Sequence, residues 1–282
     1  MNRVAIIGLG LMGGSLGLAL KRASRVTVSA FARRAETREL AIKSGAVDEV
    51  FETPQGALRG ADLAVFCTPV LSVPEIVETC MPAFGKGCIV TDVGSTKAEL
   101  VRRMATLVRP GGIRFLGSHP MTGAEKTGIE SARADLYAGT VTAITPGPET
   151  DPAAVEAVTD LWRSVGARVI SLDPGEHDLL VARTSHLPHL IAALLVGAAG
   201  REVTPRLKSL VGQGFRDATR IAAGSPEMWH DIVKTNKSAI ITELQGYDLA
   251  LRELIRLIED DRFDAVREML ERLRQQRADL LV

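Results

Sequence analysis

Short apolar runs alternate with amphipathic stretches through residues 1–172 of the chain. The runs are nearly all hydrophobic, which is typical of strands that helices cover on both faces of a sheet. We predict strands at Val4–Ile7, Val26–Phe31, Leu63–Cys67, Ile89–Asp92, Ile113–Leu116, Val141–Ile144 and Val169–Leu172. Between them lie helical patterns such as Ser15–Arg22, Pro74–Phe84, Lys97–Val108 and Ala153–Val165. This alternation predicts an α/β fold with a doubly wound, mostly parallel sheet.

Beyond Asp173-Pro174-Gly175 the strand pattern stops, and helical patterns cover Asp178–Gly200, Glu227–Ile258 and Asp264–Leu281. We therefore predict two domains, residues 1–172 and an all-α domain of residues 173–282. The helix from Leu187 onward is apolar nearly all round, which is typical of a helix buried on every side. A domain of this size could hardly cover such a helix alone, so we predict a homodimer through the C-terminal helices.

Composition and charge narrow the class of protein. The chain of 282 residues has 34 basic and 34 acidic side chains, so no strong field favours nucleic acid or an anionic membrane surface. The three cysteines lack the spacing of paired metal ligands. The longest apolar run, Leu190–Ala199, is too short to span a bilayer, and Met1-Asn2-Arg3 enters a strand at once, without a signal peptide. We expect a soluble, cytoplasmic protein without a metal site and without nucleic-acid or membrane partners.

A glycine-rich loop follows the first predicted strand directly. Gly8-Leu9-Gly10-Leu11-Met12-Gly13 has the pattern G-x-G-x-x-G and opens a helix. In this pattern Gly8 permits the tight turn, Gly10 lets a pyrophosphate approach the backbone, and Gly13 allows the helix to pack on the strand. The amides around Leu11 and Met12 would face the phosphates at the helix N-terminus. The loop predicts a Rossmann-type dinucleotide site; a glycine-rich turn without a ligand is the alternative.

The residues that end the neighbouring strands refine the cofactor. An NAD site needs a carboxylate after the second strand to bind the ribose 2′-hydroxyl, but here Arg33 and Arg34 follow Phe31. Two guanidiniums can bind a 2′-phosphate, so we predict NADP over NAD, with a pair of solvated surface arginines as the alternative. Thr68-Pro69 and Ser95 end two further strands, on the nicotinamide side of the same edge. Ser95 could instead be the N-cap of the helix that begins near Lys97.

One histidine lies in a turn-forming segment after an apolar run. In Gly117-Ser118-His119-Pro120, the proline biases the residue before it toward an extended conformation. We therefore expect His119 to be exposed at the end of a buried strand, where open parallel sheets bind ligands. Histidine is also the side chain best suited to move protons near neutral pH. A turn histidine without a chemical role is the alternative.

Five motifs occur in an order that resembles the prephenate/arogenate dehydrogenase family of tyrosine biosynthesis. They are Val4–Gly14, Asp92–Lys97, Gly117–Gly123, Ser185-His186-Leu187-Pro188-His189 and Gly214-Phe215-Arg216-Asp217-Ala218-Thr219-Arg220. The resemblance spans nearly the whole chain. It implies an NAD(P)-dependent oxidative decarboxylation of a cyclohexadienol to a phenol, and a Rossmann domain followed by a helical dimerisation domain.

The resemblance also implies roles for individual residues. His119 would be the catalytic histidine, and Ser95 its hydrogen-bonding partner near the nicotinamide. The residues on the substrate side would be His189, His186, Arg220 and Arg216, with Arg220 as the carboxylate anchor. Ala124 stands where some members of the family have a hydroxyl side chain.

Several of these residues also have plainer interpretations. His186 and His189 alone would be core or capping histidines of a helix, and His177 could do no more than start one. Trp229 and His230 fit a core residue and a cap better than a site. The charged segment Arg267–Arg277 is typical of a solvated helix face.

Two other functions compete with the resemblance. β-Hydroxyacid dehydrogenases and imine reductases share the two-domain plan, but the hydroxyacid enzymes carry a catalytic lysine early in the long helix, and Asp178–Gly200 contains no lysine. A non-catalytic NADP-binding sensor would have no need for a serine and a histidine beside the nicotinamide. The sequence leaves open the choice among prephenate, arogenate and an aminated analogue, and it leaves open feedback inhibition by tyrosine.

Overall fold

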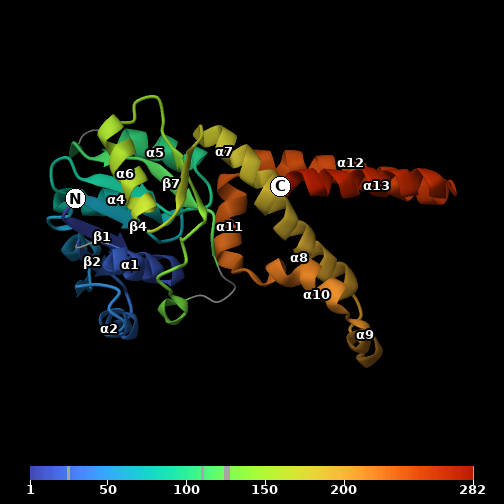
Figure 1. The fold of residues 1–282 in the computed structure, drawn as a ribbon, viewed down its shortest axis with the longest axis horizontal. Helices are drawn as coiled ribbons and strands as arrows, with labels where there is room; N and C mark the ends of the chain where they lie inside the picture. Colours follow the sequence, from blue (N-terminus) through green and yellow to red (C-terminus); the bar gives the residue numbers. More distant parts are fainter. Residues whose placement is uncertain (24–25, 109–110, 124–127, 282) are drawn as a thin grey trace. The chain divides into compact units, whose positions relative to one another are not determined.

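The computed structural model describes residues 1–23, 26–108, 111–123 and 128–281 (Figure 1). The chain divides into two compact units, Met1–Lys237 and Ser238–Val282. The first unit contains both sheets and the helices up to α11.

A six-stranded parallel sheet forms the centre of the first unit, with the strand order β3-β2-β1-β4-β5-β6. Its strands are β1 (Arg3–Ile7), β2 (Thr27–Phe31), β3 (Glu49–Phe51), β4 (Leu63–Phe66), β5 (Ile89–Asp92) and β6 (Arg114–Phe115). The connecting helices are α1 (Leu11–Ala23), α2 (Ala35–Lys43), α3 (Pro54–Leu58), α4 (Ser72–Cys80) and α5 (Ala98–Val108). The predicted doubly wound sheet is confirmed, and its order reverses between β1 and β4, where such sheets bind ligands.

The all-apolar strands are explained by burial on both faces of this sheet. Val4 and Ile6 of β1 point into one hydrophobic cluster, and Ala5 and Ile7 point into another. All four side chains are fully buried, because successive residues of a strand point to opposite faces. Helices therefore cover both faces of β1.

His119 belongs to a second sheet that the sequence did not predict. This sheet contains β7 (Gly117–Pro120), β8 (Val141–Thr145) and β9 (Arg168–Ser171), and α6 (Pro152–Ser164) connects the last two strands. β7 runs antiparallel to β8, with His119 opposite Ala143. The extended backbone expected before Pro120 is present, but it pairs as a strand, so His119 is only 9% exposed. The prediction of an exposed histidine at the end of a parallel strand is wrong.

A continuous helical run follows the second sheet. It comprises α7 (Pro174–Val181), a π-helical turn (Ala182–His186) and α8 (Leu187–Ala199). Pro188 supplies no backbone N–H for a bond to Thr184, and the wider π turn lies where that bond is missing. α9 (Pro205–Leu210), α10 (Gln213–Thr219) and α11 (Pro226–Thr235) complete the unit.

This run changes one expectation about membranes. With 26 residues, Pro174–Ala199 is long and apolar enough to cross a bilayer by length and composition alone. The apolar run Leu190–Ala199 alone predicted a segment too short for a bilayer, whereas the whole helical run is long enough. Core helices of soluble proteins share this length and composition.

The sequence predicted that α8 is buried on every side. In the single chain it is not. His189 and Ala192 are its buried residues, whereas Leu194 is 63% exposed. Leu195 and Val196 are exposed as well. An apolar face therefore lies open on this chain.

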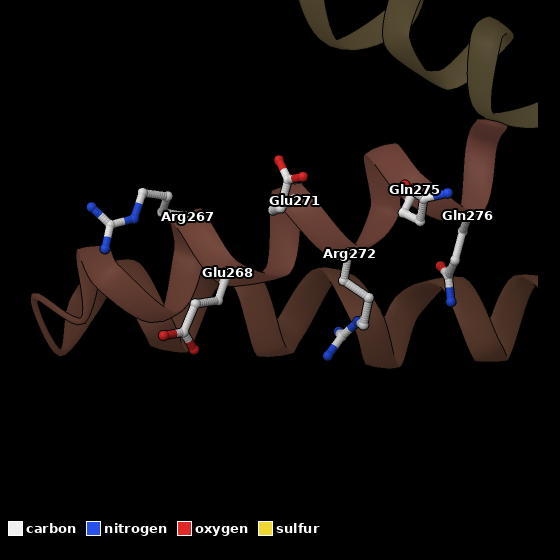
Figure 2. Close-up of a pocket in the computed structure, with 6 residues that line it drawn as sticks. All are labelled: Arg267, Glu268, Glu271, Arg272, Gln275 and Gln276. Atoms are coloured by element: carbon white, nitrogen blue, oxygen red, sulfur yellow. The ribbon is translucent and has the colours of Figure 1, made fainter.

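The second unit contains α12 (Lys237–Glu259) and α13 (Phe263–Leu280). The sequence predicted one helix over Glu227–Ile258, but the structure divides it at Asn236, which lies between α11 and α12. Figure 2 shows charged and amide side chains of α13 around a surface hollow; they are Arg267, Glu268, Glu271, Arg272, Gln275 and Gln276. Exposed ion pairs such as Arg274–Glu271 lie along the surface of α13, so the predicted solvated face is confirmed.

Candidate functional site

The turn from β1 to α1 has the geometry that the glycine pattern predicts. Gly8 has φ +105°, a conformation that side chains other than glycine rarely adopt. A Cβ on Gly13 would lie 1.9 Å from the carbonyl oxygen of Gly8, so only glycine lets the helix pack this closely on the turn. Nothing lies within 4 Å of a Cβ on Gly10, which leaves its backbone open to a pyrophosphate. The Tyr137 hydroxyl donates to the Met12 carbonyl at 2.7 Å and fixes the start of α1.

The end of β2 lies beside this turn. The Gly8 amide donates to the Phe31 carbonyl at 3.1 Å. Arg33 and Arg34 follow at the same edge, and both are exposed. Arg38 donates to the carbonyl oxygens of the two residues after Phe31, at 3.1 and 2.9 Å, and so fixes the connection that carries the two arginines. Two exposed arginines therefore lie at the end of β2, beside the glycine turn.

The residues after β4 and β5 complete the carboxyl edge of the sheet. The Thr68 hydroxyl accepts a hydrogen bond from Ser72 at 3.1 Å, and Pro69 is exposed. Ser95 is half-buried in the turn before α5. It is not the N-cap of that helix, the alternative role considered from the sequence. The Asp178 carboxylate from α7 accepts the amides of Lys97 and Ala98, at 2.8 and 2.9 Å.

The His119 ring is bonded to a second histidine. Its Nδ1 lies 2.9 Å from Nε2 of His177, and Nδ1 of His177 lies 2.8 Å from Oδ1 of Asp178. Within the described residues, no hydrogen bond joins Ser95 to His119. The Ser118 hydroxyl bonds to the Asp92 carbonyl, which places β7 beside the carboxyl end of β5. The arrangement is a buried relay, His119–His177–Asp178, at the cofactor edge of the sheet.

Burial sets the charge of this histidine. It holds the pKa of His119 well below its usual range, and nearby His177, Lys97 and His186 lower that pKa further. Lys97 is fully buried and forms an ion pair with Asp92. Burial lowers the pKa of Lys97, which the Asp92 carboxylate opposes. His119 is therefore a neutral imidazole at pH 7, able to accept a proton.

His186 and His189 flank an indole ring. His189 stacks on Trp229, with centroids 3.5 Å apart and planes 11° apart, and His186 meets the same ring edge-on at 5.8 Å. Nδ1 of His186 accepts from the Asn236 amide at 3.2 Å, and its buried Nε2 has no partner among the described residues. Burial lowers the pKa of His186 to about 4. Trp229, predicted as a core residue, is half-buried and joins the two histidines instead.

The predicted carboxylate anchor lies after α10. Arg220 begins a 3₁₀ turn, Arg220–Ala223, and both it and Arg216 are exposed. This turn packs against α8. Burial lowers the pKa of His189, and the nearby backbone of Ile221 opposes that shift. Ala124 lies outside the described residues. Within the described part of the chain, no three His, Cys, Asp or Glu side chains cluster as metal ligands do.

Three contributors to this site were not predicted from the sequence. They are Lys97, Asp178 and Asn236. The sequence left the role of His177 open, and the structure places its ring against His119. Gly175-Glu176-His177-Asp178 signalled a helix start, which is confirmed, with Asp173 capping α7. The neighbouring acid was a usable signal for a positioned imidazole, but local pattern could not show a contact across 58 residues.

Comparison with known families now identifies the chain. Residues 16–171 match the model of the prephenate dehydrogenase nucleotide-binding domain, and residues 173–272 match that of the prephenate dehydrogenase dimerization domain. The chain belongs to the prephenate dehydrogenase family. Membership makes it an oxidoreductase with a nicotinamide dinucleotide cofactor.

Relatives of this family cover nearly the whole chain. The cyclohexadienyl dehydrogenase of Zymomonas mobilis is 34% identical over 258 residues, which is 90% of this chain and 87% of the relative. The prephenate dehydrogenase of A. aeolicus, solved with hydroxyphenyl propionate and NAD+, is 31% identical with a TM-score of 0.91. The alignment covers 99% of this chain and 98% of that one. Synechocystis arogenate dehydrogenase is 29% identical with a TM-score of 0.83, over 99% of this chain and all of its own.

Proposed function

We propose that this chain catalyses the NADP-dependent oxidative decarboxylation of prephenate or L-arogenate, in tyrosine biosynthesis in the cytoplasm. The observation that carries the proposal is the buried, neutral His119 beside the carboxyl end of β5. Family membership supports the reaction class. The proposal assigns cofactor binding to residues 1–172 and substrate binding and dimerisation to residues 173–282.

The chemistry needs one group that accepts a proton and later returns it. A nicotinamide bound at this edge would supply the hydride acceptor for the carbinol carbon of the substrate. His119 accepts the hydroxyl proton at Nε2 as the oxygen becomes a carbonyl. The ring carboxylate departs as carbon dioxide, and its bonding electrons enter the ring and convert the carbonyl to a phenolate. His119 then returns the proton, so the phenol forms without net proton loss.

The cofactor would lie along the carboxyl edge. Open backbone at Gly10 and close packing at Gly13 fit a pyrophosphate at the start of α1. The other residues proposed to bind the cofactor are Gly8, Leu11, Met12, Arg33, Arg34, Thr68, Pro69 and Ser95. We assign Ser95 to the nicotinamide side and, with His119, to the catalytic pair.

The preference for NADP rests on Arg33 and Arg34, since the A. aeolicus relative was solved with NAD+. Replacing both by Ala should raise the Michaelis constant for NADP and leave that for NAD nearly unchanged. Replacing the exposed Arg59 by Ala is the matched control. An unchanged ratio of the two constants in the double variant would refute the preference.

Substrate binding is proposed for the histidines around Trp229 and the arginines after α10. His189 and His186 would face the ring, and Arg220, with Arg216 nearby in sequence, would bind the side-chain carboxylate. Replacing Arg220 by Gln should raise the Michaelis constant for the substrate far more than that for the cofactor.

A homodimer is proposed through the apolar face of α8 and the C-terminal helices. The exposed Leu194, Leu195 and Val196 support it, as does the match to a dimerization domain. Burying such a face against a second copy removes apolar surface from water. Sedimentation at micromolar concentration should give twice the mass of one chain.

Reduction of NADP with prephenate and with arogenate in turn tests the reaction. His119→Asn should lower kcat by about 10²- to 10⁴-fold, the usual contribution of a general base, while NADP affinity stays nearly intact. Wild-type turnover in this variant would refute the role of His119. Cofactor binding without activity on either substrate would favour the NADP-binding sensor. Activity on a hydroxyacid or imine alone would favour the reductase alternative.

A further inference from the structure

Three buried side chains from two elements form one hydrogen-bonded relay. His119 comes from β7, and His177 and Asp178 come from the second turn of α7. The two bonds, at 2.9 and 2.8 Å, are both within normal range. The same carboxylate accepts two backbone amides at the start of α5, so its position is fixed independently of the histidines.

With Asp178 ionised and His177 neutral, the donors and acceptors of this relay allow one arrangement of the protons. An ionised Asp178 can only accept, so Nδ1 of His177 carries the proton of the bond between them. Nε2 of a neutral His177 then holds a lone pair and must accept from Nδ1 of His119. The other nitrogen of His119, Nε2, is therefore the unprotonated one. It forms no hydrogen bond with any described residue.

We propose that His177 and Asp178 are positioning residues that hold His119 in the tautomer with the proton on Nδ1. This inference rests on the proposed role of His119 as the proton acceptor. Only in this tautomer can Nε2 take the substrate hydroxyl proton. After that transfer, the Nδ1–H of the His119 imidazolium still donates to Nε2 of His177, and the Asp178 carboxylate accepts from the opposite side of the His177 ring.

The relay supplies the hydrogen bond to the His119 ring that the sequence assigned to Ser95. A serine hydroxyl can donate or accept, so it would not by itself choose between the two tautomers. An Asp–His pair has a fixed direction, because the carboxylate has no proton to give. In serine proteases a carboxylate orients the catalytic histidine in the same way, and loss of that orientation lowers kcat about 10⁴-fold.

The first test uses the wild-type protein and needs no turnover. The chain has five histidines, and long-range proton–nitrogen spectra distinguish the two ring tautomers. Signals are assigned by single substitution of each histidine. We expect His119 with its proton on Nδ1 near pH 7. A proton on Nε2 would overturn the inference, whatever the activity of the protein.

The second test separates positioning from simple packing. His177→Phe keeps an aromatic ring but offers no acceptor, and it should lower kcat by about 10²-fold, the lower range for loss of general-base action. The Michaelis constants and the affinity for NADP should change little. His177→Gln places an amide oxygen near the former Nε2 position, and it should recover most of the lost kcat and the Nδ1 proton of His119.

The control is another adjacent His–Asp pair. His230 and Asp231 are bonded through Nδ1 and Oδ1 at 3.0 Å, but the His230 side chain is 68% exposed. His230→Phe should leave kcat unchanged. Equal kcat values for the Phe and Gln variants of His177, or wild-type kcat in His177→Phe, would overturn the inference. Inactivity of the wild type on both substrates would refute the proposed function instead, and the spectra would still decide the tautomer.

Discussion

Acid should destabilise this protein partly through His186. Burial lowers the pKa of His186 from 6.5 to about 4. Between these values the unfolded chain binds a proton that the folded chain does not, so stability is intact above pH 6.5 and declines as the pH falls toward 4. One pKa unit corresponds to about 1.4 kcal/mol, so the shift amounts to about 3 kcal/mol in full and about 2 kcal/mol at pH 5.

The assay compares wild type with His186→Asn in urea unfolding at steps from pH 7 to 4.5. The asparagine oxygen can replace Nδ1 as the acceptor for Asn236. The variant should lose about 2 kcal/mol less than wild type between pH 7 and pH 5. His119 also favours the neutral form in the folded state, and burial, the largest cause of its low pKa, acts in both proteins, so most of its contribution cancels in the comparison. Equal losses in the two proteins would refute this account.

Two further predictions concern the buried ion pair and the glycine loop. Lys97→Met should cost about 3–5 kcal/mol of unfolding free energy, because it leaves the Asp92 carboxylate buried and unpaired. Adding Asp92→Asn should recover part of that loss in the same urea titration, and a single variant as stable as wild type would contradict the reasoning. Gly13→Ala should lower the thermal midpoint as well as NADP affinity, since its Cβ would meet backbone. Gly10→Ala should lower only the affinity, and a similar fall in midpoint would contradict the open space found there.

The parallel sheet was predictable because its strands are buried on both faces. Continuous apolar runs such as Leu63–Cys67 signal this environment directly. β3 and α3 were missed because they are short, at 3 and 5 residues. The second sheet was missed for another reason. β7 consists of Gly, Ser, His and Pro, which carry a turn signal, and its pairing with β8 depends on residues more than twenty positions away.

The site likewise contains features that local sequence predicts and features that depend on tertiary packing. The glycine loop could be predicted because the local backbone itself requires glycine, for the tight turn at Gly8 and the close helix packing at Gly13. The partner of His119 could not, because it depends on how α7 packs against β7. Ser95 is close in sequence to the cofactor edge, whereas His177 reaches the catalytic ring from beyond the nucleotide-binding segment. Proximity in the chain pointed to Ser95, whereas the hydrogen bond to the His119 ring in the structure comes from His177.

The position of Asp178 has a consequence for protein engineering. Its carboxylate caps α5 of the nucleotide-binding half, while the residue itself belongs to α7 of the following segment. A truncation at residue 172 would leave the first amides of α5 uncapped and the His119 ring without its partner. Chimaeras between members of this family should therefore be joined after α7, so that the catalytic histidine and the carboxylate that orients it come from one parent.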